Sequence, residues 1–122
     1  MRPIQATFFK GGARSGLRWH PSGKTISVVS DRGVAAVCVE PGPLFGKSCF
    51  LTPHGAAQPN ADAVAWSNSG KMIAFNRPVP TRNDQGVIAK DATGRDFLQV
   101  FVADFPDANN NGIADPIESG RQ

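Results

Sequence analysis

The sequence lacks the features that would place the protein in a membrane or mark it for export. No apolar run approaches the length that a membrane-spanning helix needs. The N-terminal residues 1–12, MRPIQATFFKGG, contain no apolar core of the kind that a signal peptide requires. Either a signal was removed or lies upstream of this sequence, or the protein stays inside the cell.

Signatures of catalysis are also missing. No serine stands in a Gly-x-Ser-x-Gly turn, and the glycine-rich residues 9–16 lack both the Walker spacing and a following helix. His20 and His54 lie far apart in the chain, and no cysteine–histidine cluster has zinc spacing. We therefore predict no catalytic residue and no enzyme activity within this sequence, and we expect both histidines to be structural or solvated.

Runs of basic residues are absent as well. The formal net charge is +3, and residues 1–50 hold seven Lys or Arg against two acids, Asp31 and Glu40. These basic residues are scattered singly, and no predicted helix presents them as a cluster. The pattern indicates a solvated surface and does not favour nucleic-acid binding.

Turn-forming residues, by contrast, are abundant. A chain of 122 residues is at most one ordinary domain, and 13 Gly with 10 Pro favour many short strands over long helices. Two ungapped segments, WHPSGKTISVVS at 19–30 and WSNSGKMIAFNR at 66–77, repeat at an offset of 47 residues (66 minus 19). Such a period is typical of propeller blades or solenoid units.

Each copy of the repeat predicts an antiparallel hairpin. A short strand reaches the tryptophan, a tight turn follows at HPSGK or SNSGK, and the strand TISVV or MIAF leaves that turn. Third strands are predicted at 34–40 and 97–104, and a fourth strand at 48–52 closes the first unit. Because Trp19 and Trp66 occupy equivalent positions, both are expected to pack in the core.

The second copy also carries an insertion. Residues 77–96 replace the three-residue turn at 31–33, with VIAK predicted as an extra short strand and DATG as the turn after it. Insertions in repeats of this kind fall in loops on one face, where binding occurs. A solvated loop without a function is nevertheless the favoured interpretation.

The repeated segments resemble the WD-like repeat of TolB-type proteins, whose core runs Trp-Ser-Pro-Asp-Gly-Lys-x-Ile-Ala-Phe. In this sequence Ser22 and Ser69 replace the usual Asp, and His20 replaces a Ser. The resemblance implies an all-β fold built from antiparallel four-stranded β-propeller blades. It divides the single segment 1–122 into blade 1 at about 14–53 and blade 2 at about 61–105.

The resemblance further implies a bacterial protein in a periplasmic, secreted or lipoprotein setting, with a role in protein interaction or scaffolding more often than in catalysis. Two blades do not close a ring, so we expect further blades from a longer chain or self-association of this one. The segment IQATFFK at residues 4–10 is expected to form the last strand of a preceding blade.

A calcium-loop pattern follows the second copy, at residues 107–118, DANNNGIADPIE. Such loops need oxygen ligands at positions 1, 3, 5, 7, 9 and 12, with glycine at position 6, which is Gly112 here. The predicted ligands are Asp107, Asn109, Asn111, the carbonyl of Ile113, Asp115 and Glu118.

The flanks of this loop are a strand before it and a single helical turn, PIES, after it, so it resembles the calcium loops of bacterial secreted proteins and thrombospondin-type repeats. Its three carboxylates predict weak binding, roughly 10⁻⁴ to 10⁻³ M. The alternative is a cluster of acidic Asx turns that holds no metal.

Two cysteines fall on the predicted third and fourth strands of the first unit. Antiparallel neighbours could bring Cys38 and Cys49 within bridging distance. A secreted location would favour a disulfide, whereas the alternative is two half-buried thiols that act as small hydrophobic groups.

Two classes of function stay open. The first is a non-catalytic TolB-like propeller segment, secreted or periplasmic, that binds a protein or polysaccharide and holds a structural calcium ion. The alternative is the propeller portion of a prolyl-oligopeptidase-like hydrolase whose catalytic domain is absent from this sequence, or a calcium-dependent adhesion module. Flanking sequence separates the classes, because a Gly-x-Ser-x-Gly segment would favour the enzyme and further WD-like repeats the scaffold.

Overall fold

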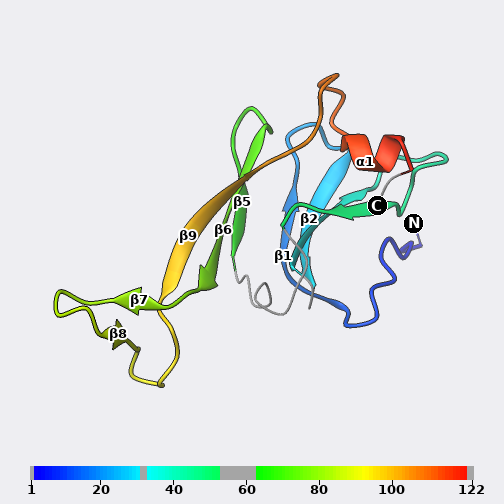
Figure 1. Cartoon of the computed structure of the whole chain (residues 1–122). Coiled ribbons are helices and arrows are strands. Elements are labelled where there is room, and N and C mark those ends of the chain that lie inside the picture. The colour runs from blue at the N-terminus through cyan, green and yellow to red at the C-terminus, as the bar shows by residue number, and fades with distance from the viewer. Residues whose placement is uncertain (1, 31–32, 53–62, 121–122) are drawn as a thin grey trace.

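The protein is an all-β structure of antiparallel sheets, as predicted (Figure 1). A computed structural model describes residues 2–30, 33–52 and 63–120. Sheet A has its strands in chain order: β1 (Ala13–Trp19), β2 (Thr25–Ser30), β3 (Gly33–Cys38) and β4 (Ser48–Phe50). Sheet B has the order β5 (Val64–Trp66), β6 (Met72–Pro78) and β9 (Leu98–Asp104).

The insertion forms a protruding arm between β6 and β9 (Figure 1). Within it, β7 (Thr81–Arg82) and β8 (Ile88–Ala89) pair as a small hairpin. The extra strand predicted at VIAK and the turn predicted at DATG are therefore both confirmed. A short helix, α1 (Asp115–Glu118), confirms the helical turn predicted near the C-terminus.

The two copies of the repeat build equivalent turns. In the first, the His20 carbonyl accepts a hydrogen bond from the backbone N–H of Gly23 at 2.9 Å, and in the second the Ser67 carbonyl accepts one from Gly70 at 2.9 Å. Both glycines have a φ close to +75°, a left-handed conformation that disfavours other residues. The repeated Ser-Gly-Lys therefore encodes the same tight turn twice.

The strand register extends this equivalence to the third strands. Val29 pairs with Val34 in sheet A, and the equivalent Asn76 pairs with Val100 in sheet B. Likewise, Ile26 pairs with Val37, and the equivalent Ile73 pairs with Ala103. Val34 is thus the counterpart of Val100.

The sheets stack in the same sense. Val29 and Val34 of sheet A pack in one buried cluster with Ile73 and Phe75 of sheet B. The sheet A counterparts of Ile73 and Phe75 lie on the opposite face of sheet A, which Ala6 and Phe9 cover. The two sheets are equivalent units, but each contributes a different face to the contact between them. Sheet A contributes one face, and sheet B contributes the face that corresponds to the other face of sheet A.

A histidine clasp joins the turns of the two sheets. The Nδ1 atom of His20 accepts a hydrogen bond from the Ser22 backbone N–H at 3.1 Å, so Nε2 carries the proton and donates to the Gly70 carbonyl at 2.9 Å. The ring lies between Trp66 and Phe105, with centroids 4.9 and 4.7 Å away. His20 is structural, as predicted, whereas His54 lies outside the described residues.

Three expectations need correction. Trp19 is 65% exposed, because no turn in the described part of the chain packs on it as the His20 turn packs on Trp66. Residues 4–10 form no strand, because they lie on the face of sheet A through Ala6 and Phe9 instead of along a strand edge. Sheet B contains three strands among the described residues, so the fourth strand of sheet A has no counterpart there.

The cysteines are both buried, and both thiols are free. Cys49 pairs with Ala36, whereas the Cys38 backbone N–H donates to the Lys47 carbonyl, so the two cysteines are diagonal neighbours. Diagonal Cα atoms lie about 7–8 Å apart, beyond the range of an unstrained disulfide. Burial raises the pKa of Cys49 to about 11 and also raises that of Cys38, which keeps both thiols protonated.

Candidate metal centre

The loop with the calcium-binding pattern leaves sheet B and packs on sheet A (Figure 1). Phe105 is still held at the end of sheet B, because its backbone N–H donates to the Lys71 carbonyl at 2.8 Å. Beyond it, three apolar side chains enter a buried cluster with Ala36 and both cysteines of sheet A: Ile113, Ala114 and Ile117. The loop is therefore anchored by apolar contacts to the first copy of the repeat.

Close contacts with the β1–β2 turn fix the middle of the loop. The Thr25 hydroxyl donates a buried hydrogen bond to the Gly112 carbonyl at 2.6 Å. Gly112 has a φ of +85°, and a Cβ atom there would collide with the side chain of Ser22. Glycine is thus required at the sixth loop position both by backbone conformation and by its neighbour.

Asp107 organises the first half of the loop, as the first position of the pattern predicts. Its carboxylate accepts hydrogen bonds from the backbone N–H groups of Asn111 at 3.1 Å and Gly112 at 2.7 Å. The Asn111 side-chain oxygen in turn accepts one from the Ile113 backbone N–H at 3.0 Å. These bonds curl the backbone around the Asp107 carboxylate.

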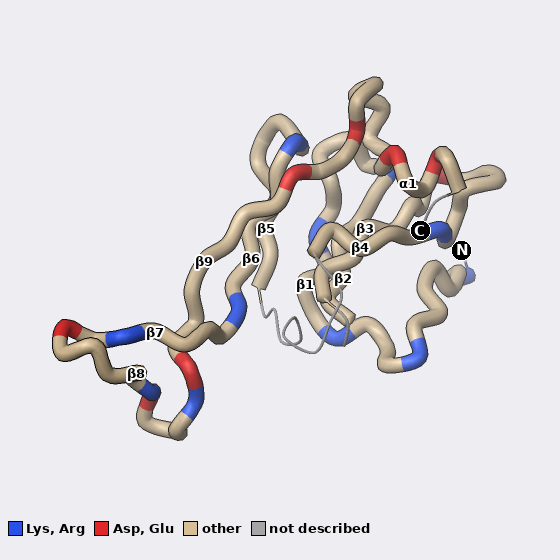
Figure 2. Tube along the Cα trace, viewed as in Figure 1, with Lys and Arg blue, Asp and Glu red and all other residues tan. Residues whose placement is uncertain are grey.

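Three carboxylates converge at the mouth of the loop, where acidic residues gather around α1 (Figure 2). Carboxylate oxygen atoms of Asp107, Asp115 and Glu118 all lie within 4.8 Å of one another. Oxygen ligands of one calcium ion at 2.3–2.6 Å lie no more than about 5 Å apart, so this spacing fits a shared cation. The three acidic ligands that the sequence predicts are therefore brought together.

The two asparagines among the predicted ligands are placed differently from the carboxylates. Asn109 and Asn111 donate their side-chain N–H groups to the Glu118 carboxylate, at 3.4 and 2.7 Å. Ile113 is buried through its side chain. These amide N–H groups stabilise the Glu118 carboxylate by hydrogen bonds, and the two asparagines would become ligands only if their amide oxygens turned toward the cation.

Sequence reasoning missed the residues of sheet A that seat the loop. Ser22 and Thr25 precede Gly112 by almost ninety residues, and their contact depends on the stacking of the two sheets. The one local signal was Gly112 itself, which the calcium pattern explains without any neighbour. The contacts of Ser22 and Thr25 with the loop can therefore be identified only from the three-dimensional structure.

Fold and loop together define an all-β protein built from two equivalent antiparallel units with an acidic C-terminal loop. The uncharacterized protein YidR of Escherichia coli strain K12 is 36% identical to it over 73 residues, which are 60% of this chain. The matched part makes up 17% of YidR, so the chain spans about a sixth of that protein's length. No family model matches the sequence, and no solved structure matches it.

Among the described residues, no helix is both long and apolar enough to cross a membrane.

Proposed function

We propose that this chain is a TolB-like β-propeller segment without catalytic activity, which binds a protein or polysaccharide partner through its loops. The observation that carries the proposal is the stacking of two equivalent sheets in the same sense, Val29 and Val34 against Ile73 and Phe75. Propeller blades repeat this arrangement around a ring, with one face of each blade on the opposite face of the next. The WD-like repeat supports the same assignment.

The outer face of sheet B supports the presence of further blades. Val100 is 76% exposed and Val102 is 61% exposed, whereas the counterpart of Val100 in sheet A, Val34, is fully buried against sheet B. Exposed apolar faces of this kind mark association surfaces. We propose that another blade covers this face, either from a longer chain or from a second copy.

Light scattering after size exclusion tests this association. We expect the chain to self-associate and the Val100→Lys variant to be monomeric, because a charge would be buried in the contact. Val87→Lys is the matched control, since Val87 is a similarly exposed apolar residue, but it lies on the arm and should leave association unchanged. A wild-type chain that is monomeric at every concentration would contradict the exposed-face argument.

We further propose that Asp107, Asp115 and Glu118 hold a structural calcium ion, with Asn109, Asn111 and the Ile113 carbonyl completing its ligands. The spacing of the three carboxylates and the backbone curl around Asp107 support this proposal. The ion would hold the crossing loop in place on sheet A and take no part in catalysis. A weak site of this type suits a calcium-rich secreted or periplasmic setting.

Calorimetric titration with Ca²⁺ tests the metal proposal. We expect a dissociation constant of roughly 10⁻⁴ to 10⁻³ M, and binding at least about tenfold weaker for Glu118→Gln, which removes one charged ligand without changing its size. Asp84→Asn, which changes an exposed acid on the arm, should bind calcium like the wild type. Indistinguishable titrations of the wild type and Glu118→Gln would refute the site.

A further inference from the structure

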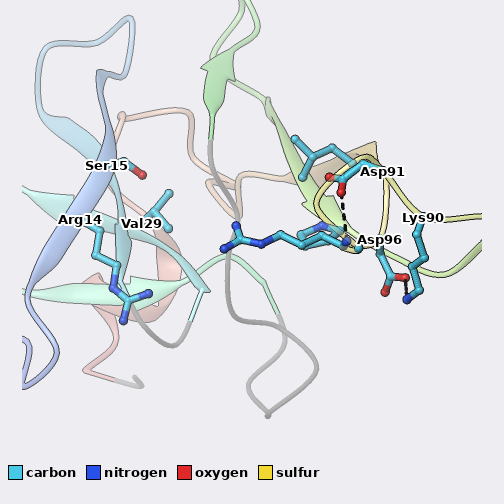
Figure 3. Close-up of a pocket in the computed structure, with 10 residues that line it drawn as sticks. Arg14, Ser15, Val29, Lys90, Asp91 and Asp96 are labelled. Carbon is cyan, nitrogen blue, oxygen red and sulfur yellow. Dashed lines mark hydrogen bonds and ion pairs between the residues drawn. The ribbon is translucent and has the colours of Figure 1, made fainter.

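A cleft of about 910 Å³ is lined by residues of sheet A, by residues of the arm and by the ends of β6 and β9 next to the arm (Figure 3). Figure 3 shows Arg14, Ser15 and Val29 on one side and Lys90, Asp91 and Asp96 on the other. The cleft is as large as the pockets that hold small ligands in other proteins. Its two walls come from segments that are distant in the sequence.

A β-bulge places Arg14 at this cleft. Ala13 pairs with Ser30 and Ser15 pairs with Val29, so Arg14 is the extra residue between two consecutive pairs. Bulges of this kind re-aim one side chain and occur next to functional sites. Arg14 is exposed and makes no hydrogen bond or ion pair within the described residues.

The opposite wall is a closed turn that presents Arg95. One Asp91 carboxylate oxygen accepts hydrogen bonds from the Thr93 hydroxyl at 2.6 Å, the Thr93 backbone N–H at 2.8 Å and the Arg95 backbone N–H at 3.0 Å. The Thr93 hydroxyl, and then the Arg95 backbone, hold the pKa of Asp91 below its usual value. The Asp91 carboxylate is therefore ionised and committed to its own turn.

Among the described charged side chains that line the cleft, only two guanidinium groups are not already engaged by the turn or by an ion pair. Lys90 and Asp96 form an ion pair with each other at the base of the turn. The Arg95 side chain is exposed and forms no ion pair among the described residues, although its charge slightly favours ionised Asp91. Arg14 and Arg95 thus line one cleft as cations whose hydrogen-bond donors are available.

We propose that this cleft binds a small ligand that carries phosphate or carboxylate groups, held between Arg14 and Arg95. Guanidinium groups match the planar, paired oxygen atoms of such anions and bind them with charge-assisted hydrogen bonds. Val29, Pro78 and Leu98 line the same cleft and offer apolar contacts to the rest of the ligand. No residue of the calcium loop lines this cleft among the described residues.

Calorimetric titrations with inorganic phosphate and with succinate, in a calcium-free buffer of low ionic strength, test the proposal. We expect at least one probe to bind, and both Arg14→Gln and Arg95→Gln to weaken that binding at least about tenfold, because each removes a charged hydrogen-bond donor. The matched control is Arg18→Gln, on the same strand but outside the cleft, which should change affinity less than about twofold. Binding of phosphate alone or of succinate alone identifies which of the two anionic groups the cleft selects.

The three substituted side chains are exposed, so the variants should keep the thermal unfolding midpoint of the wild type. Two results would overturn the proposal. One is the absence of binding by both probes at millimolar concentration. The other is an equal loss in Arg18→Gln and the cleft variants, which would show attraction to net charge instead of a site.

Discussion

Sheets A and B come from the same repeat, yet their third strands differ completely in exposure. Every residue of β3 is buried, whereas most of β9 is exposed. Val34 is fully buried and its counterpart Val100 is 76% exposed. The repeated sequence therefore encodes strands, register and turns, and the neighbours of each sheet decide which residues become core.

The neighbours explain the difference. Sheet B covers one face of sheet A, and Ala6 with Phe9 covers the other. Within the described ranges, sheet B has a neighbour on one face only, and its outer edge at β9 pairs with no further strand. The two units thus have the same internal geometry with different numbers of partners.

The largest predicted effect comes from placing a lysine at the two equivalent positions. Val34→Lys should reduce the free energy of unfolding by more than about 4 kcal/mol, because the cation would be buried without a partner. Val100→Lys should change it by less than about 0.5 kcal/mol. Denaturant unfolding of both variants, at a concentration where the wild type is monomeric, measures the difference.

The second variant serves as the matched control for the first, since the substitution and the strand position are the same. Equal losses at the two positions would mean that the outer face of sheet B is already covered in the isolated chain. Such a result would remove the contrast between the sheets and the reason to expect another blade there.

Much of the fold could be predicted because its signals are local. The Gly23 and Gly70 turns, the alternation in β2 and β6 and the short strand β8 all follow from a few adjacent residues. The exposure of Trp19 could not be predicted, since its sequence neighbourhood is nearly that of Trp66. Only the presence of an adjacent turn separates the two tryptophans, and that depends on stacking.

The same distinction applies to the sites. The acidic ligands of the candidate metal centre lie within twelve consecutive residues, so the sequence alone brings Asp107 and Glu118 together. The cleft depends on Arg14 and Arg95, which are far apart in the chain and line one cleft only in the folded structure. The bulge that places Arg14 was not predicted from the sequence.

A smaller predicted effect compares the two turn glycines. Gly23→Ala and Gly70→Ala both place a side chain at a φ near +75°, which costs roughly 1–2 kcal/mol. A Cβ atom at position 23 has open space around it, but at position 70 it would collide with Nε2 of His20. That collision would also break the hydrogen bond to the Gly70 carbonyl, so we expect a total loss of about 2–4 kcal/mol for Gly70→Ala.

A third substitution, at His20, tests whether the extra destabilisation by Gly70→Ala comes from the histidine clasp between the sheets. In a His20→Ala background, neither the collision nor the hydrogen bond exists, so Gly70→Ala and Gly23→Ala should destabilise the protein equally. Denaturant unfolding of the five variants completes the cycle. If the excess cost of Gly70→Ala persists without the imidazole, the turns of the two sheets are not coupled through His20. If the excess disappears, the His20 side chain alone explains why alanine costs more stability at position 70 than at position 23, although the two turns have the same backbone conformation.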